Sequence, residues 1–397
     1  MAKLGMPSVN IAFVEAGIEA IQRSQRGIVA LLLEEPQDTI TKLLKDHEIT
    51  TSGSGDTAST TTVKAISNPF AVYTSDDIPA ELSEENKDYI TKTLIGYTKA
   101  PYRVRVYLMA KDETNDSKAD KFAEALKGLA TDRWDYLAIP TITQTQCESV
   151  GTWLKTNREN KHKRSKVILP GYAGDYEGII NFSNTTIVTA NKTYTGAQYI
   201  PRIAGLLCGT PMTSAISATY APLAEVIDCD RYTADERDEK VNKGEFFVWF
   251  DGEKFKMSRA MNSLVTTTQG KQEAYQTIKS VDIMDMIYDD IRKTCEDSYI
   301  GKYANDFDNK QLLISAIIGY FRELESGRLL QKAYSTVYLN EDNIKNYQLQ
   351  HGLYTKDELA DMTSLEIQKL DTKKKVFLGA NIKILDAMED FDLPINI

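Results

Sequence analysis

Between residues 102 and 208 the sequence alternates strand-like with helix-like segments, and this alternation restricts the fold more than any other feature. Three segments have the apolar patterns of strands: 102–108, 134–140 and 166–169. Three others carry apolar residues at helical spacing: 117–129, 146–158 and 196–208. Strands that alternate with helices predict a parallel sheet covered on both faces, with right-handed crossovers. We therefore expect an α/β core over residues 101–222.

Segments on either side of these six also have recognisable patterns. Gln25–Leu33 is an apolar run opened by Gly27, which predicts a strand buried on both faces. A short helix is expected over 38–47 with Asp38 as its cap, and Thr50–Thr62, almost all Thr, Ser, Gly and Ala, predicts a surface loop. Two further elements are expected within the core: a short helix over 175–182 and a strand over 185–189.

Beyond Pro222 the pattern changes. Asp251-Gly252 between two aromatic-rich runs predicts a hairpin, and helices are expected over 278–296 and 309–332. Three short strands are expected after them: 336–339, 365–367 and 376–384. The predicted domains are an N-terminal arm (1–20), a small N-terminal α/β or β region (21–100), the α/β core (101–222), a C-terminal α+β domain (223–375) and a C-terminal arm (376–397).

Both ends of the chain resemble strands that have no partner of their own. Large apolar residues alternate with smaller or polar ones near each end: Val9, Ile11 and Phe13, and Phe391, Leu393, Ile395 and Ile397. An unpaired strand is a template for pairing with another chain. We therefore interpret the ends as extended β arms that are exchanged between neighbouring copies, and the function as assembly.

Composition narrows the class of protein. The chain has 397 residues, 26% of them charged, with a net charge of -10, which argues against sequence-independent nucleic-acid binding because such binding needs dense Lys and Arg. Its four cysteines are far apart in sequence, which favours a reducing cytoplasm. We find neither the pattern of a signal peptide nor an apolar run of 18 residues, so a membrane partner is not expected.

The chemistry of an active site is mostly missing from the sequence. Its three histidines form no metal-binding pair, so neither a metal nor a cofactor is expected. Gly209–Ala215 loosely resembles the nucleophile motif of subtilisin-like proteases, but Pro211 stands at the nucleophile position. Pro170–Gly178 follows a predicted strand and opens a predicted helix, where a phosphate could bind. Without a triad or a P-loop, we expect no enzyme.

Several charged residues allow either a structural or a functional interpretation. The basic run Lys161–Lys166 is interpreted as a solvated helix end or as a contact with an acidic neighbour. Asp285 and Asp289, four residues apart, fit an exposed helix face better than a catalytic pair. The broad apolar face from Leu312 to Leu324 suits core packing or a docking helix, and basic residues flank it: Lys310, Arg322, Arg328 and Lys332.

The chain resembles the tail sheath proteins of contractile phage tails and of R-type bacteriocin particles. Four segments in the same order carry this resemblance: Gly5–Ile11, Arg26–Ala30, Asp135–Pro140 and Asp386–Glu389 followed by the alternating tail. The resemblance implies a subtilisin-like core without the triad, and arms that add strands to the sheets of adjacent subunits. Between Glu35 and Pro101 there is little room for the outer β-sandwich of larger members.

The resemblance also implies partners and a place of action. Subunits would polymerise as stacked rings or a helix around an inner tail tube, with a baseplate and a tail terminator as further partners, and would contract to drive the tube through a cell envelope. The helix over 309–332 would contact the tube. The protein would assemble in the host bacterial cytoplasm and then belong to a virion or phage-like particle.

Two other classes remain open from the residues. One is a doubly wound enzyme or nucleotide-binding protein that uses the Pro170–Gly178 turn. The other is a surface-layer or other self-assembling shell protein, which would share the arms.

Overall fold

The computed structural model describes residues 20–51, 59–63, 65–111, 115–212 and 216–395, and among these the side chains of 47–51, 59–63 and 115–118 are not described. The chain divides into two compact units. The first, here called the sheet unit, comprises Ser24–Asp289 and Ile384–Ile397. The second, the helical unit, comprises Met1–Arg23 and Asp290–Lys383.

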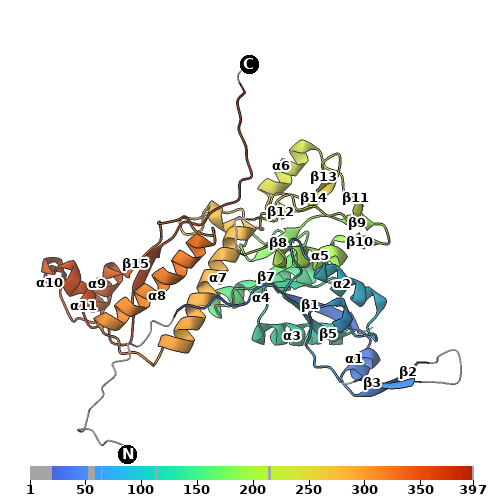
Figure 1. Ribbon diagram of the computed structural model, residues 1–397, viewed down its shortest axis with the longest axis horizontal. Helices are drawn as coiled ribbons and strands as arrows, with labels where there is room; N and C mark the ends of the chain where they lie inside the picture. Colours follow the sequence, from blue (N-terminus) through green and yellow to red (C-terminus); the bar gives the residue numbers. More distant parts are fainter. Residues whose placement is uncertain (1–19, 52–58, 64, 112–114, 213–215, 396–397) are drawn as a thin grey trace, which may run out of the picture. The chain divides into compact units, whose positions relative to one another are not determined.

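A seven-stranded sheet forms the centre of the sheet unit (Figure 1), in the order β12-β8-β7-β6-β1-β5-β4. All neighbouring pairs are parallel except β4 with β5, which are antiparallel. The strands are β1 (Ile28–Glu35), β4 (Phe70–Val72), β5 (Arg103–Ala110), β6 (Tyr136–Ala138), β7 (Lys166–Pro170), β8 (Ile179–Phe182) and β12 (Glu245–Phe246). The predicted parallel α/β sheet is confirmed.

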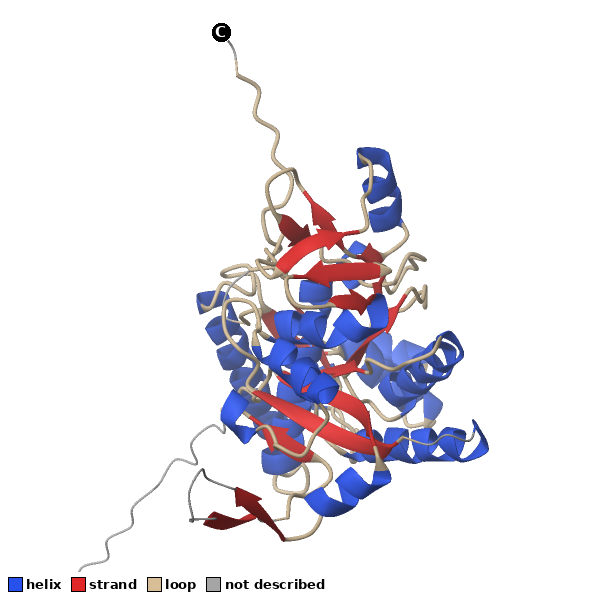
Figure 2. Cartoon of the chain, turned by 90° about the vertical axis from the view of Figure 1, so that its right-hand side faces the viewer, coloured by secondary structure: helices blue, strands red, loops and turns tan. Residues whose placement is uncertain are grey.

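Helices cover both faces of this sheet, which explains the unbroken apolar run of β1. Successive β1 residues point to opposite faces, so Val29, Leu31 and Leu33 enter one core cluster while Ile28, Ala30 and Leu32 enter the other. The first cluster includes residues of α2 (Glu84–Leu94) and α5 (Gly196–Cys208). The second includes residues of α3 (Asn115–Thr131) and α4 (Gln144–Asn160). Figure 2 shows helices on both sides of the strands.

Helix α5 shows how local sequence and packing agree. Thr195 accepts a hydrogen bond from the backbone N–H of Gln198, and the Gln198 side chain returns one to the backbone of Thr195, so a capping box begins the helix. Gly205 lets α5 approach α2 closely, since a Cβ built there would lie 2.0 Å from the carbonyl oxygen of Thr93. Helix α5 is therefore fixed against both the sheet and α2.

The rest of the sheet unit surrounds this core. A three-stranded sheet joins β9 (Thr186–Thr189), β10 (Thr193–Thr195) and β11 (Val226–Cys229), and β13 (Val248–Phe250) pairs with β14 (Phe255–Met257). The remaining elements are α1 (Gln37–Leu43), the paired strands β2 (His47–Thr51) and β3 (Ser59–Val63), the 3₁₀ turns 75–77 and 273–275, α6 (Ala234–Asn242) and α7 (Ile278–Thr294). The boundary between the units falls within α7, after Asp289.

The helical unit has its own small core, made by Ile314, Leu339, Ile344 and Ile367. A π-helical turn at 295–299 precedes its elements, which are α8 (Phe307–Ser326), β15 (Thr336–Leu339), α9 (Glu341–Gln350), α10 (Lys356–Asp361), α11 (Ser364–Lys369) and β16 (Leu378–Asn381). β15 and β16 pair as antiparallel strands. The C-terminal α+β domain expected over 223–375 stays a prediction.

Four local predictions are wrong. Ile179–Phe182 is strand β8 of the main sheet rather than part of a helix, and residues 365–367 lie in helix α11 rather than in a strand. Strands β2 and β3 occupy both ends of the predicted 50–62 loop. Asp38 is inside α1, whose cap position is Pro36. The predicted strand at 185–189 exists as β9 but belongs to the smaller sheet.

Candidate functional site

The C-terminal tail leaves the sheet unit with its apolar side chains uncovered. Residues 385–395 carry neither helix nor strand, and Figure 2 shows the tail running outward from the unit. Phe391, Leu393 and Ile395 are 80%, 78% and 77% exposed. Exposed large apolar side chains at strand spacing mark a surface that another chain can cover. Four residues of the predicted arms lie outside the described residues: Val9, Ile11, Phe13 and Ile397.

The base of this tail is held by the sheet unit. The carboxylate of Glu389 accepts hydrogen bonds from the hydroxyls of Thr219 (2.7 Å) and Ser217 (3.1 Å) and pairs with Arg259 (3.1 Å). Arg259 also pairs with Asp390. The tail is thus attached through Glu389 and Asp390, whereas the apolar side chains of Met388 before them and of Phe391 after them are exposed.

A buried ion-pair network lies at the amino ends of the central strands. Asp285 of α7 is 3% exposed and accepts two hydrogen bonds from Arg158, each 3.0 Å, while the Lys166 ammonium lies 2.6 Å from it. Lys166 also pairs with Asp282 (2.8 Å), and the side chain of Asp289 pairs with Arg26 (2.7 Å). Since these carboxylates face the sheet, the prediction that Asp285 and Asp289 lie on an exposed helix face is wrong.

The pKa values in this network follow from its geometry. Burial by itself raises the pKa of Asp285, but the adjacent Lys166 and Arg158 outweigh it and hold the pKa below its ordinary value. For Asp289, burial is the larger effect and its pKa is raised. The network joins the start of β1, the start of β7 and the end of α4 to α7, so it fixes α7 against the sheet.

The basic run Lys161–Lys166 contributes to this packing rather than forming a solvated helix end. Lys166 is buried as described, and Arg164 lies over the ring of Tyr288, 4.2 Å from its centre. The ammonium of Lys163 donates to the carbonyl oxygens of Ala130 (2.5 Å) and Asp132, and burial lowers its pKa to about 8. The acidic neighbour of this run is α7 of the same chain.

The Pro170–Gly178 turn lacks the geometry of a phosphate site. Strand β8 follows it, so the turn does not open the helix on which a phosphate was expected to bind. The Asp175 carboxylate accepts the backbone N–H groups of Val265 (2.8 Å) and Thr266 (2.9 Å), and the buried Glu177 pairs with Lys271 (2.9 Å). The nucleotide-binding hypothesis therefore loses the feature on which it was based.

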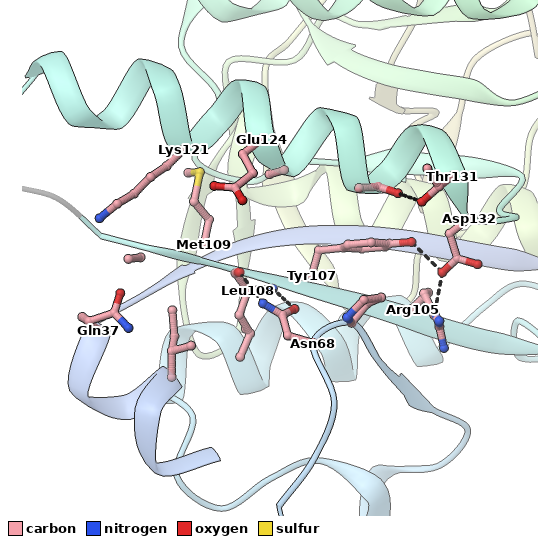
Figure 3. Close-up of a pocket in the computed structure, with 15 residues that line it drawn as sticks. Gln37, Asn68, Arg105, Tyr107, Leu108, Met109, Lys121, Glu124, Thr131 and Asp132 are labelled. Carbon is pink, nitrogen blue, oxygen red and sulfur yellow. Dashed lines mark hydrogen bonds and ion pairs between the residues drawn. The ribbon is translucent and has the colours of Figure 1, made fainter. Parts of the chain in front are cut away.

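A pocket of about 610 Å³ lies between α3 and the outer part of β5 (Figure 3). At one end Asp132 accepts hydrogen bonds from Arg105 (2.6 Å) and from the hydroxyl of Tyr107 (2.7 Å). Burial by itself raises the pKa of Asp132, but these two bonds outweigh it and lower that pKa. No Ser, Cys or His is among the described residues that line the pocket, and its charged end is internally paired.

The described parts of the chain contain neither a metal site nor a membrane-spanning helix. Within them, no cluster of three or more His, Cys, Asp or Glu side chains could hold a metal ion. No helix among the described residues has the length and apolar content needed to cross a membrane.

The models of two protein domains together match most of the chain. Residues 115–263 match the phage tail sheath protein central domain, and residues 270–397 match the phage tail sheath C-terminal domain. The chain belongs to the phage tail sheath family. The tail sheath protein of Clostridium phage phiCD119 is 31% identical over 394 residues, which cover 99% of each chain.

Solved sheath structures share the fold. The helical sheath of the anti-feeding prophage in its contracted state gives a TM-score of 0.65 at 13% identity and covers 99% of both chains. The sheath tail protein of Desulfitobacterium hafniense gives a TM-score of 0.61 at 17% identity, covering 83% of this chain and 93% of that one. The resemblance stated from the sequence is thus confirmed, and the fold is shared with the contracted sheath of the anti-feeding prophage.

In this sheath protein the four basic residues predicted to contact a tube have different environments. Arg322 on α8, and Arg328 and Lys332 after it, are exposed. Lys310 is 5% exposed, and burial lowers its pKa although Asp371 and Asp306 lie near it. Among the apolar residues of α8, Ile314 enters the core of the helical unit, so part of the predicted docking face is core.

The contacts that hold the tail, between Glu389 and Arg259 and the two hydroxyls, were not predicted from the sequence. Asp386–Glu389 was singled out as a segment that carries the family resemblance, but nothing in the sequence indicates which groups Glu389 contacts.

Proposed function

We propose that this sheath protein is the structural subunit of a contractile tail that polymerises around an inner tube through strand exchange. The observation that carries the proposal is the exposed alternation of Phe391, Leu393 and Ile395 beyond an anchored base. Family membership supports the sheath role, and the exchange is inferred from the tail's chemistry.

The sheet formed by β15 and β16 is our candidate acceptor for arms from neighbouring copies. Within the described residues it has two strands, and a sheet of two strands is marginally stable by itself. On β15, Leu339 is buried and Val337 packs against the small core, while Thr336 and Tyr338 are exposed, so added strands would extend a sheet that already has an inner face.

Rough magnitudes show why exchange suits a polymer. Burying four large side chains of the tail contributes roughly 6–12 kcal/mol as an upper bound. Association of one free protein costs on the order of 4–15 kcal/mol. One arm is therefore marginal, whereas a subunit held by several arms is stable. Free subunits would stay dissolved until a growing end offers several contacts together.

The remaining parts of the proposal follow from the sheath role. Arg322, Arg328 and Lys332 are the candidate tube contacts, and Lys310 is a weaker candidate because it is buried. Baseplate and terminator proteins would complete the tail, which would assemble in the host bacterial cytoplasm. Contraction would be a rigid rotation of the subunits into denser packing while the exchanged strands hold them together. The role needs no catalysis.

Deleting residues 391–397 tests strand exchange. The truncated protein should be folded and monomeric, with unchanged thermal unfolding, and it should form no sheath by sedimentation or negative-stain microscopy. Asp392→Asn is the matched control, because it changes the same segment but leaves the apolar alternation in place. Normal sheaths from the truncated protein would refute the proposal.

A further inference from the structure

The contacts of Glu389 form a preorganised site for one carboxylate. The hydroxyl of Thr219 accepts the backbone N–H of Ala260 (2.9 Å), so its own proton is free to point toward Glu389 (2.7 Å). The hydroxyl of Ser217 accepts the backbone N–H of Thr219 (2.9 Å) and lies 3.1 Å from the same carboxylate oxygen. Both hydroxyls are therefore positioned by the backbone of the sheet unit.

Arg259 completes the site from the other side. Its guanidinium reaches the second oxygen of Glu389 (3.1 Å), with 38% of the Arg259 side chain and 19% of the Glu389 side chain exposed. At this exposure the ion pair is partly screened by solvent, so the hydrogen bonds from the half-buried hydroxyls of Ser217 and Thr219 strengthen the attachment of Glu389 beyond what the ion pair contributes. Asp386, three residues earlier, accepts a hydrogen bond from Ser280 (3.3 Å) and gives the segment a second attachment.

The tail changes from attached at Glu389 to exposed at Phe391, two residues later. Glu389 is enclosed as described, whereas Phe391 is 80% exposed. The apolar residues that would enter another sheet thus begin directly after the fixed point. The geometry points to Glu389 as a positioning residue that fixes where, and at which residue, the exchanged strand leaves its own subunit.

This inference rests on the proposed strand exchange and makes it specific. Residues 391–397 are the part of the tail that we expect to reach a second copy of the chain. At about 3.3 Å per residue they span roughly 23 Å when extended, so they can meet an acceptor edge that lies within that distance of the anchor. Because Glu389 is already held in the free subunit, fewer residues must be ordered when the strand docks.

Loss of the anchor should weaken assembly without removing the strand. Glu389→Ala would release residues 387–389, because Ser280 still holds Asp386 and Asp390 keeps only its exposed pair with Arg259. Ordering even one additional residue weakens association by about tenfold. We expect the concentration of full-length protein needed for sheath formation, measured by sedimentation, to rise at least about tenfold. Glu389→Gln keeps an acceptor for the hydroxyls but loses the charge that pairs with Arg259, so it should fall between Glu389→Ala and the natural protein.

A second measurement reports the anchor in the free subunit. Trypsin cleavage after Lys383, followed by mass spectrometry of the released 384–397 peptide, should be faster for Glu389→Ala than for the natural protein. Asp392→Asn, which removes a carboxylate beyond the anchor, should leave both cleavage and assembly unchanged. Thermal unfolding of the three proteins should coincide, which shows that the fold is intact.

The possible outcomes distinguish failure of the Glu389 anchor from failure of strand exchange itself. If Glu389→Ala assembles and is cleaved like the natural protein while deletion of 391–397 abolishes sheaths, the anchor has no role and strand exchange stands. If the deletion also forms sheaths, strand exchange itself fails. Should Glu389→Ala misfold, Glu389→Gln decides the question by the same two measurements, and an unchanged Glu389→Gln overturns the inference.

Discussion

Replacing Asp285 with Asn should destabilise the sheet unit more than any exposed substitution, because it removes one charge from a buried network. Asn has nearly the same volume as Asp, so no large cavity accompanies the change. Arg158 and Lys166, which are 2% and 1% exposed, would lose their closest carboxylate and keep only Glu177 at 4.0 Å and Asp282 at 2.8 Å. Removing one partner of a buried ion pair costs about 3–5 kcal/mol. Against a typical domain stability of roughly 5–15 kcal/mol, such a loss is easily measured.

Urea unfolding followed by tryptophan fluorescence is a suitable assay. All three tryptophans, Trp134, Trp153 and Trp249, belong to the sheet unit, so the signal reports that unit. Glu239→Gln provides a control, since it removes one charge from an exposed pair in which Glu239 lies 2.6 Å from Lys243. The reasoning is refuted if the unfolding midpoint of Asp285→Asn equals that of the control.

The stability lost in Asp285→Asn should also depend on pH. Because Lys166 and Arg158 outweigh burial and hold the pKa of Asp285 below its ordinary value, its ionised form stabilises the folded state. This contribution is complete above the unfolded pKa of about 3.9 and is lost as the pH falls through the lower folded value. The stability difference between the natural protein and Asp285→Asn should therefore be constant near neutral pH and shrink below about pH 4. A difference that grows on acidification would contradict the assignment.

Two further predictions concern the packing of α5 and the contact with the tube. Gly205→Ala should lower the stability of the sheet unit by about 1–3 kcal/mol, because the new Cβ would meet the carbonyl oxygen of Thr93. Gly128→Ala in α3 is the control and should be neutral or stabilising, since the space around its Cβ is open; equal unfolding midpoints of the two variants would argue against close contact of α2 and α5. Arg322→Glu with Arg328→Glu should leave the polymerisation of free subunits intact but reduce co-sedimentation with inner tubes, and undiminished binding would remove these residues as tube contacts.

The parallel sheet could be predicted because its strands are patterned by burial on both faces. Leu31 and Leu32 face different core clusters, and only a continuous apolar run satisfies both. A helix was expected over 175–182 because the four-residue run Ile179–Phe182 is too short to show a clear period. Thr363 and Glu366 form a capping box, which was a usable signal for α11 although Leu365 and Ile367 alternate like a strand.

The candidate site was only half visible in the sequence. The apolar alternation of the tail is local, so Phe391, Leu393 and Ile395 could be named in advance. The anchor depends on contacts between distant segments, since Thr219 is 170 residues from Glu389. In the same way, spacing of Asp285 and Asp289 says nothing about the cations that face them, because Arg158 is 127 residues away. The spacing of residues along one helix or strand does not reveal which distant charges they will pair with in the folded protein.

The account depends most on where the last residues of each subunit lie in the assembled polymer. Electron cryomicroscopy of the sheath at a resolution that shows side chains measures this directly. We predict that residues 391–397 form a strand paired with the β15–β16 sheet of a neighbouring subunit, while Glu389 keeps its contacts with its own Thr219 and Arg259. Tails that instead fold back onto their own subunit, with the β15–β16 edges covered from within the same chain, would contradict the account.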